Sequence, residues 1–217
     1  AVAYYFARQI HLDQNVPIGI VNASLGGSPI EAWMHKDILS PYPDKIAAGE
    51  RFADPAVDKQ TRKDDKARSD SWYAKLHQSD EGLQSEVKWY DPELDDSAWQ
   101  AITMPGNLPT NGKEFIGVWW LRKTLHLDEV PAEPVTLRLG RIVDADTAYI
   151  NGHEVGDTGY QYPPRRYNVT PDMLKKGENV IAIRITSDGG STGFVQDNAY
   201  FLGTDNARYP LAGEWHY

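Results

Sequence analysis

The hydrophobic pattern changes its period along the chain, and its first part reads as a helix followed by a strand. Val2, Phe6 and Ile10 recur every four positions, which predicts an amphipathic helix over residues 1–12. Residues 16–21 form a nearly continuous apolar run rich in β-branched side chains. Such a run is typical of a strand buried on both faces of a parallel sheet.

A glycine turn and a helix start follow this predicted strand. Gly26 and Gly27 precede Ser28, which can cap a helix, and Glu31 completes a capping box with it. The order strand, glycine turn, helix places open backbone N–H groups where anions and developing oxyanions are stabilised. Two glycines also form ordinary tight turns, so the spacing alone favours a plain turn.

The middle of the chain is polar. Residues 45–53 and 58–76 carry helix-compatible patterns, and the second range alternates acidic and basic side chains in TRKDDKARSD. We interpret this part as a solvated helical bridge. A lone strand has no ladder partner, so the preceding segment is expected to be a fragment of a larger α/β domain.

From about residue 83 the apolar residues recur at every second position. Residues 119–127, 135–139 and 181–185 alternate in this way and predict half-buried strands. Asn151-Gly152 is a strong signal for a two-residue hairpin. A short helix is expected within 170–177. Several short strands separated by turns predict an antiparallel β-sandwich.

Composition excludes several classes of function. The 217 residues carry a net charge of −9, which argues against nucleic acid or anionic membrane surfaces as partners. Cys is absent, so no disulfide framework, thiol nucleophile or thiolate metal site is possible. The six His form no metal-binding pair. Asp95-Asp96 and Asp144 with Asp146 could bind a cation or act as acid and base, but turn capping is the commoner role of such pairs.

Two parts of the chain resemble known families. The strings AYYFA and PIGIVNASLGGSPIEAWM closely resemble the sialate O-acetylesterases, a branch of the SGNH-type serine esterases. This resemblance implies that Gly26 or Gly27 supplies an oxyanion-hole N–H and has a catalytic role. WYDPELDDSAWQAITMPG and GVWWLRKTLHL resemble the jelly-roll, galactose-binding-like domain of family 2 glycoside hydrolases, which also occurs as an insert in the esterases.

The resemblance implies a fold of two kinds: an α/β fragment, one βα unit of an SGNH-type domain, plus an all-β jelly-roll or galactose-binding-like sandwich. It places part of the esterase domain at 1–40, a helical bridge at 41–82, the inserted β-sandwich at 83–206 and a return segment at 207–217. The family's GQSN-like and DxxH motifs, which carry the nucleophile and the His base, are missing from the sequence. The chain alone is therefore expected to be inactive.

The implied partners are an O-acetylated sialic acid or related acetylated sugar and the remainder of the esterase domain. No cofactor is expected, and the implied location is secreted or periplasmic. Tyr160, Tyr162 and Arg165 are predicted to bind substrate from a loop of the sandwich, with Arg165 suited to a sialic acid carboxylate. Packing of the loop onto the sheet is the alternative role of these side chains, and the commoner one. The alternative function is a non-catalytic carbohydrate-binding β-sandwich module.

Overall fold

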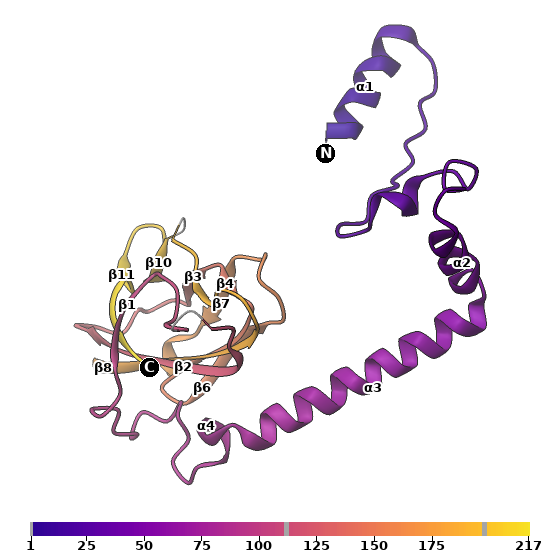
Figure 1. Cartoon of the computed structure of the whole chain (residues 1–217). Coiled ribbons are helices and arrows are strands. Elements are labelled where there is room, and N and C mark those ends of the chain that lie inside the picture. Colours follow the sequence, from indigo (N-terminus) through magenta and orange to yellow (C-terminus); the bar gives the residue numbers. More distant parts are fainter. Residues whose placement is uncertain (1, 111–112, 197–198) are drawn as a thin grey trace. The chain divides into compact units, whose positions relative to one another are not determined.

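The structure, a computed structural model, describes residues 2–110, 113–196 and 199–217. The chain divides into two compact units, Ala1–Ala67 and Arg68–Tyr217. Helix α3 (Pro55–Ser79) contains the boundary between them. Figure 1 shows the helical elements of the first unit and the sheets of the second.

The first unit consists of helices and irregular segments. Helix α1 (Val2–Gln14), the 3₁₀ helix η1 (Ile30–Trp33) and helix α2 (Pro43–Phe52) follow one another along the chain. The predictions of helices near 1–12, 45–53 and 58–76 are confirmed by α1, α2 and α3. Among the described residues, no helix is both long and apolar enough to span a bilayer.

The predicted strand and capped α-helix of this unit are absent from its described residues. Residues 16–21 belong to no strand, and Val21 is 90% exposed. Ser28 does not cap a helix, because its hydroxyl donates to the Leu25 carbonyl oxygen at 2.6 Å. The α-helix expected after Gly27 is a single 3₁₀ turn. Because a strand needs backbone partners, the apolar run alone does not form one here.

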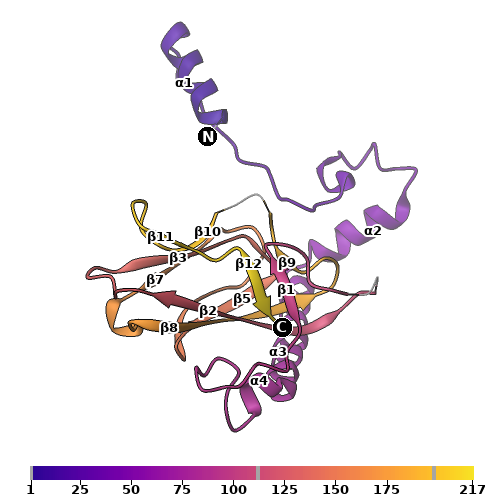
Figure 2. The ribbon, with the colours of Figure 1, turned by 90° about the vertical axis from the view of Figure 1, so that its left-hand side faces the viewer.

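The second unit is an antiparallel β-sandwich, as the period-two pattern predicts. Figure 2 shows its two principal sheets stacked face to face. The larger sheet has the order β1-β12-β2-β8-β5-β6, the smaller β11-β10-β3-β7, and β4 pairs with β9. The strands of the larger sheet are β1 (Ala101–Met104), β2 (Ile116–Leu127), β5 (Ala145–Ile150), β6 (His153–Thr158), β8 (Gly177–Asp188) and β12 (Gly213–His216).

The remaining strands complete the sandwich. They are β3 (Val135–Gly140), β7 (Arg165–Val169), β10 (Tyr200–Gly203), β11 (Arg208–Pro210), β4 (Ile142–Val143) and β9 (Gly193–Phe194). Residues 207–217, predicted as a return segment to another domain, supply β11 and β12. Strand β12 pairs with both β1 and β2, and Trp215 within it is fully buried. The predicted domain limits themselves stay a prediction.

The longest pairing joins β2 and β8 over twelve residues, from Ile116↔Asp188 to Leu127↔Gly177. Strand β8 is predicted to be half-buried, but both of its faces are covered. Ile181, Ile183 and Ile185 lie in the core between the sheets, while Ala182 belongs to a second cluster on the outer face. Helix α4 (Glu81–Gln84) and the segment that follows it cover this outer face with Leu83, Trp89, Tyr90 and Trp99.

Two local predictions in this unit meet different outcomes. Asn151 and Gly152 have φ values of 48° and 86° and connect β5 to β6, so the hairpin is confirmed. The helix expected within 170–177 is only the 3₁₀ turn η2 (Pro171–Met173). The Asn151 side chain adds a tertiary role, since its amide donates to the Met173 carbonyl oxygen at 2.9 Å.

Candidate functional site

A cavity of about 170 Å³ lies in the second unit, where the loop between β6 and β7 meets the last residue of β8. The second half of α3 forms another of its walls. Aromatic rings, two carboxyl groups and a hydroxyl therefore surround one small space. The residues that line it are Trp72, Tyr73, Asp144, Ala145, Gly159, Tyr160, Gln161, Tyr162, Thr186 and Asp188.

Four aromatic side chains form two edge-to-face pairs at this cavity. The rings of Tyr160 and Tyr162 are 6.2 Å apart between centroids, and those of Trp72 and Tyr73 are 4.7 Å apart. Tyr73, Tyr160 and Tyr162 are 53%, 59% and 67% exposed. Their rings are thus accessible to solvent, and the predicted binding role of Tyr160 and Tyr162 stays a prediction.

The polar wall of the cavity is acidic. The Asp188 backbone N–H donates to Oδ2 of Asp144 at 3.2 Å, and the two carboxyl groups also interact directly. Burial raises the pKa of Asp144, and the hydrogen bond with the Asp188 side chain raises it further. Thr186 accepts a hydrogen bond from Nη1 of Arg184 at 3.1 Å. The wall therefore presents mainly hydrogen-bond acceptors.

Arg165, which is predicted to bind substrate beside the two tyrosines, lies in the interior. Its side chain is fully buried, and Nε donates to Oδ1 of Asp146 at 2.6 Å. Its Nη1 donates to the carbonyl oxygens of Gln161 and Pro163, and Nη2 donates to that of Asp144. The guanidinium thus holds the backbone of the cavity's loop from beneath. This burial removes Arg165 from the side chains that a ligand can contact.

The contribution of α3 to the cavity is not predicted from the sequence. Asp80, directly after α3, accepts from Nε1 of Trp120 at 2.8 Å and from Nε of Arg184 at 2.6 Å. This buried junction fixes the end of α3 on the outer face of the larger sheet. Trp72 and Tyr73 consequently reach the cavity. The available signal is an aromatic pair near the end of a helix that is otherwise polar.

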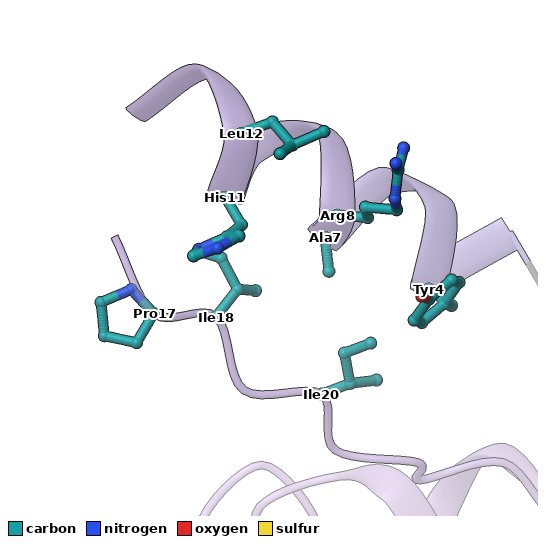
Figure 3. A pocket seen from close by; sticks show the side chains of 8 residues that line it. All are labelled: Tyr4, Ala7, Arg8, His11, Leu12, Pro17, Ile18 and Ile20. Atoms are coloured by element: carbon teal, nitrogen blue, oxygen red, sulfur yellow. The ribbon is translucent and has the colours of Figure 1, made fainter. Parts of the chain in front are cut away.

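The predicted catalytic glycines lie elsewhere, in the first unit. Gly26 and Gly27 occupy an exposed turn, and a Cβ at either position would meet open space. A cavity of about 600 Å³ in this unit is lined by residues between Pro29 and Ala53, and its lining includes neither glycine. Another, of about 450 Å³, lies between α1 and residues 17–20 (Figure 3). The described side chains that line it are aliphatic, aromatic or basic. The structure therefore does not bring the glycines into a described cavity with a nucleophile.

Asp95, Asp96 and Asp146 have structural roles. Asp96 accepts from the buried Nε of Arg122 at 2.9 Å, and Asp95 accepts from the Ser97 backbone N–H at 3.0 Å. Asp146 accepts from Arg165 and from the Tyr167 hydroxyl. Within the described ranges, no group of three or more His, Cys, Asp or Glu could hold a metal ion.

The fold and the site together define an antiparallel β-sandwich with a small aromatic and acidic cavity at its loops. No protein-family model matches the chain, and no curated protein matches it. Among solved structures, it is similar to a family 2 glycosyl hydrolase from Bacteroides cellulosilyticus, with 21% identity and a TM-score of 0.43. That match covers 50% of this chain and 17% of the other.

Two further solved structures are β-glucuronidases. The chain is 26% identical to β-glucuronidase 2 of Bacteroides uniformis, with a TM-score of 0.41, over 58% of this chain and 15% of that one. It is 18% identical to the enzyme of Bifidobacterium dentium, with a TM-score of 0.38, over 45% and 16% of the two chains. The chain thus spans less than a fifth of the length of these three proteins.

These findings correct the assignment to the sialate O-acetylesterases and, with it, the prediction of a carboxylic ester hydrolase. The solved structures to which the chain is similar are glycoside hydrolases, not esterases. The described residues 2–67 contain no strand and therefore no SGNH-type βα unit. The oxyanion role of Gly26 and Gly27 was implied by the esterase assignment and loses its basis with it. The secreted or periplasmic location stays a prediction.

Proposed function

We propose that the β-sandwich of residues 68–217 is a non-catalytic carbohydrate-binding module of a larger protein. Its finer classification as a jelly-roll, galactose-binding-like sandwich is part of this proposal. The observation that carries it is the convergence of two aromatic pairs and several hydrogen-bond acceptors on one cavity. The ligand would be one residue of a sugar chain, bound through Tyr160, Tyr162, Trp72 and Tyr73.

A sugar ring has two kinds of surface, and the cavity offers a partner for each. The C–H groups on the face of a pyranose are apolar and stack on aromatic rings, while its hydroxyl groups donate and accept hydrogen bonds at the edge. The tyrosine rings would contact the face, and Asp144, Asp188 and Thr186 the edge. The cavity is smaller than the roughly 300–1,000 Å³ of drug-sized sites, so it suits a single sugar ring.

The arrangement of the two carboxyl groups favours binding over hydrolysis. Glycoside hydrolases hold their two carboxyl groups about 5–9.5 Å apart, on either side of the bond that is cleaved. Asp144 and Asp188 instead interact directly with each other on one wall. Two carboxyl groups that interact directly do not lie on either side of a bond to be cleaved. We therefore propose that these groups accept sugar hydroxyls and do not serve as an acid and a nucleophile.

Binding to a glycan array and calorimetric titration of the full chain test this proposal. Tyr160→Ala, Tyr162→Ala and Trp72→Ala should each weaken binding by up to about tenfold, the usual size of one aromatic contact. Tyr42→Ala is the matched control, since Tyr42 is 56% exposed but lies in the first unit. Absence of sugar binding, or binding that these three substitutions leave unchanged, would refute the proposal.

A further inference from the structure

The electrostatic character of the cavity limits which sugars it can hold. Asp144 and Asp188 line it, whereas its described lining contains no Lys, Arg or His. Asp188 is exposed and Asp144 is half-buried, so both carboxyl groups are accessible. An anionic group on a ligand would therefore approach two acidic side chains without meeting a cation on the cavity surface.

Arg165 and Arg184, which contact residues of the cavity lining, do not compensate for this acidity. Arg165 lies beneath the loop with its side chain fully buried, and its Nε contacts the carboxylate of Asp146. Arg184 is paired in the same way with Asp80, and its side chain is 14% exposed. Each guanidinium is thus already matched by a buried carboxylate. Asp144 and Asp188 are therefore the charged side chains in the described lining of the cavity.

We infer that the cavity selects sugar residues without an acidic group and rejects uronic and sialic acids. This inference rests on the proposed function and names the ligand class of the same site. The neighbouring carboxyl groups of Asp144 and Asp188 would accept hydrogen bonds from adjacent hydroxyls of an uncharged sugar. The carboxylate of an acidic sugar at the same place would leave three acidic groups together, which is strongly unfavourable in a partly desolvated site.

This selectivity is opposite to the one that the sequence predicts. Arg165 beside two tyrosines indicates a site for the carboxylate of a sialic acid. The structure buries that cation and exposes two acids in its place. Arg166, the next residue, lies on the exposed side of β7 and does not line the cavity. The charge that the cavity presents to a ligand therefore depends on which side of β7 each arginine occupies.

Matched sugar pairs test the inference on the full chain at neutral pH. We would titrate methyl glucoside against methyl glucuronide, and methyl galactoside against methyl galacturonide, with ligand-observed NMR. The neutral member of the preferred pair should bind at least tenfold more tightly. Asp188→Asn should reduce this preference severalfold, because it removes one acidic group and keeps the shape. Asp128→Asn, at a side chain 96% exposed and outside the cavity lining, should leave the preference unchanged.

Each outcome separates the inference from the proposed function. Equal or tighter binding of the acidic sugar, with sensitivity to Tyr160→Ala, would overturn the inference and leave the sugar site in place. A preference for neutral sugars that Asp188→Asn leaves unaltered would also overturn it, since the selectivity would then arise elsewhere. Binding of no sugar in either pair or on the array, or binding indifferent to Tyr160→Ala, would overturn both statements.

Discussion

The Nε of Arg165 lies 2.6 Å from Oδ1 of Asp146, and both side chains are completely buried. Arg165 belongs to β7 in the smaller sheet and Asp146 to β5 in the larger one, so this ion pair joins the two sheets. The Tyr167 hydroxyl, also on β7, donates to the other carboxylate oxygen at 2.7 Å. Burial raises the pKa of Asp146, and the guanidinium and the phenol oppose that rise.

Removing Arg165 should therefore destabilise the sandwich. Arg165→Ala leaves the Asp146 carboxylate buried without its charge partner, which typically costs about 3–5 kcal/mol. Urea unfolding of the full chain, followed by tryptophan fluorescence, measures this loss. The exposed neighbour provides the control: Arg166→Ala should change the stability by less than about 0.5 kcal/mol. Nearly equal stability of both variants would show that the buried pair is unimportant.

The junction at Asp80 should couple the stability of the sandwich to the position of α3. Asp80→Ala removes the partner of the buried Nε1 of Trp120 and of the Arg184 guanidinium, so a loss of about 3 kcal/mol is expected. Unfolding by urea measures it, and Glu86→Ala, at an exposed acid, is the control.

The same substitution should also affect the cavity. Because Asp80 fixes the end of α3, sugar binding by Asp80→Ala should weaken even where the protein remains folded. A variant with reduced stability but unchanged sugar affinity would show that Trp72 and Tyr73 are held in place by other contacts.

Because the pKa of Asp144 is raised, the stability of the folded chain should depend on pH. The folded state holds this proton more tightly than the unfolded chain, whose pKa is near the ordinary 3.8. The contribution of Asp144 to the free energy of unfolding is therefore fully present below pH 3.8. It is lost as the pH rises through the folded pKa. As the pH rises from 3.8 through the folded pKa of Asp144, the urea midpoint of the chain should fall relative to that of Asp144→Asn.

Direct titration gives an independent check on the same pair. The carboxyl carbon of Asp144, followed by NMR, should titrate above 3.8 in the folded chain. Asp188→Asn should lower that midpoint, because the amide can donate to the Asp144 carboxylate and no longer competes as an acid. A midpoint that does not move would show that Asp188 does not influence Asp144.

The C-terminal strands should be indispensable to the sandwich. Residues 68–217 contain both sheets, while removal of 207–217 would take away β11 and β12 and expose an edge of β2. It would also remove Trp215 and Leu211 from the core. Residues 68–217 should melt cooperatively with a β-type circular dichroism spectrum, whereas 68–206 should not. A cooperative melt of the shorter fragment would contradict this prediction.

The sequence by itself determined the elements whose causes are local. The four-residue period predicted α1, and the two-residue period predicted β2, β3 and β8. Asn151-Gly152 specified its hairpin through the positive φ values that both residues tolerate. The exposed loop of Tyr160 and Tyr162 was also predictable, because the alternation of the flanking strands stops there. These features depend on neighbours a few positions apart.

Only the tertiary structure decided which distant residues meet and which side chains reach the solvent. The apolar run at 16–21 has the composition of a strand, but strand formation requires a backbone partner that a local pattern cannot supply. Arg165 and Arg166 are chemically identical, and their different fates follow from the two faces of β7, of which one meets Asp146 and the other lies exposed. Trp72 reaches the cavity of Tyr160 because Asp80 binds Trp120 and Arg184, and no sequence period records such a long-range contact.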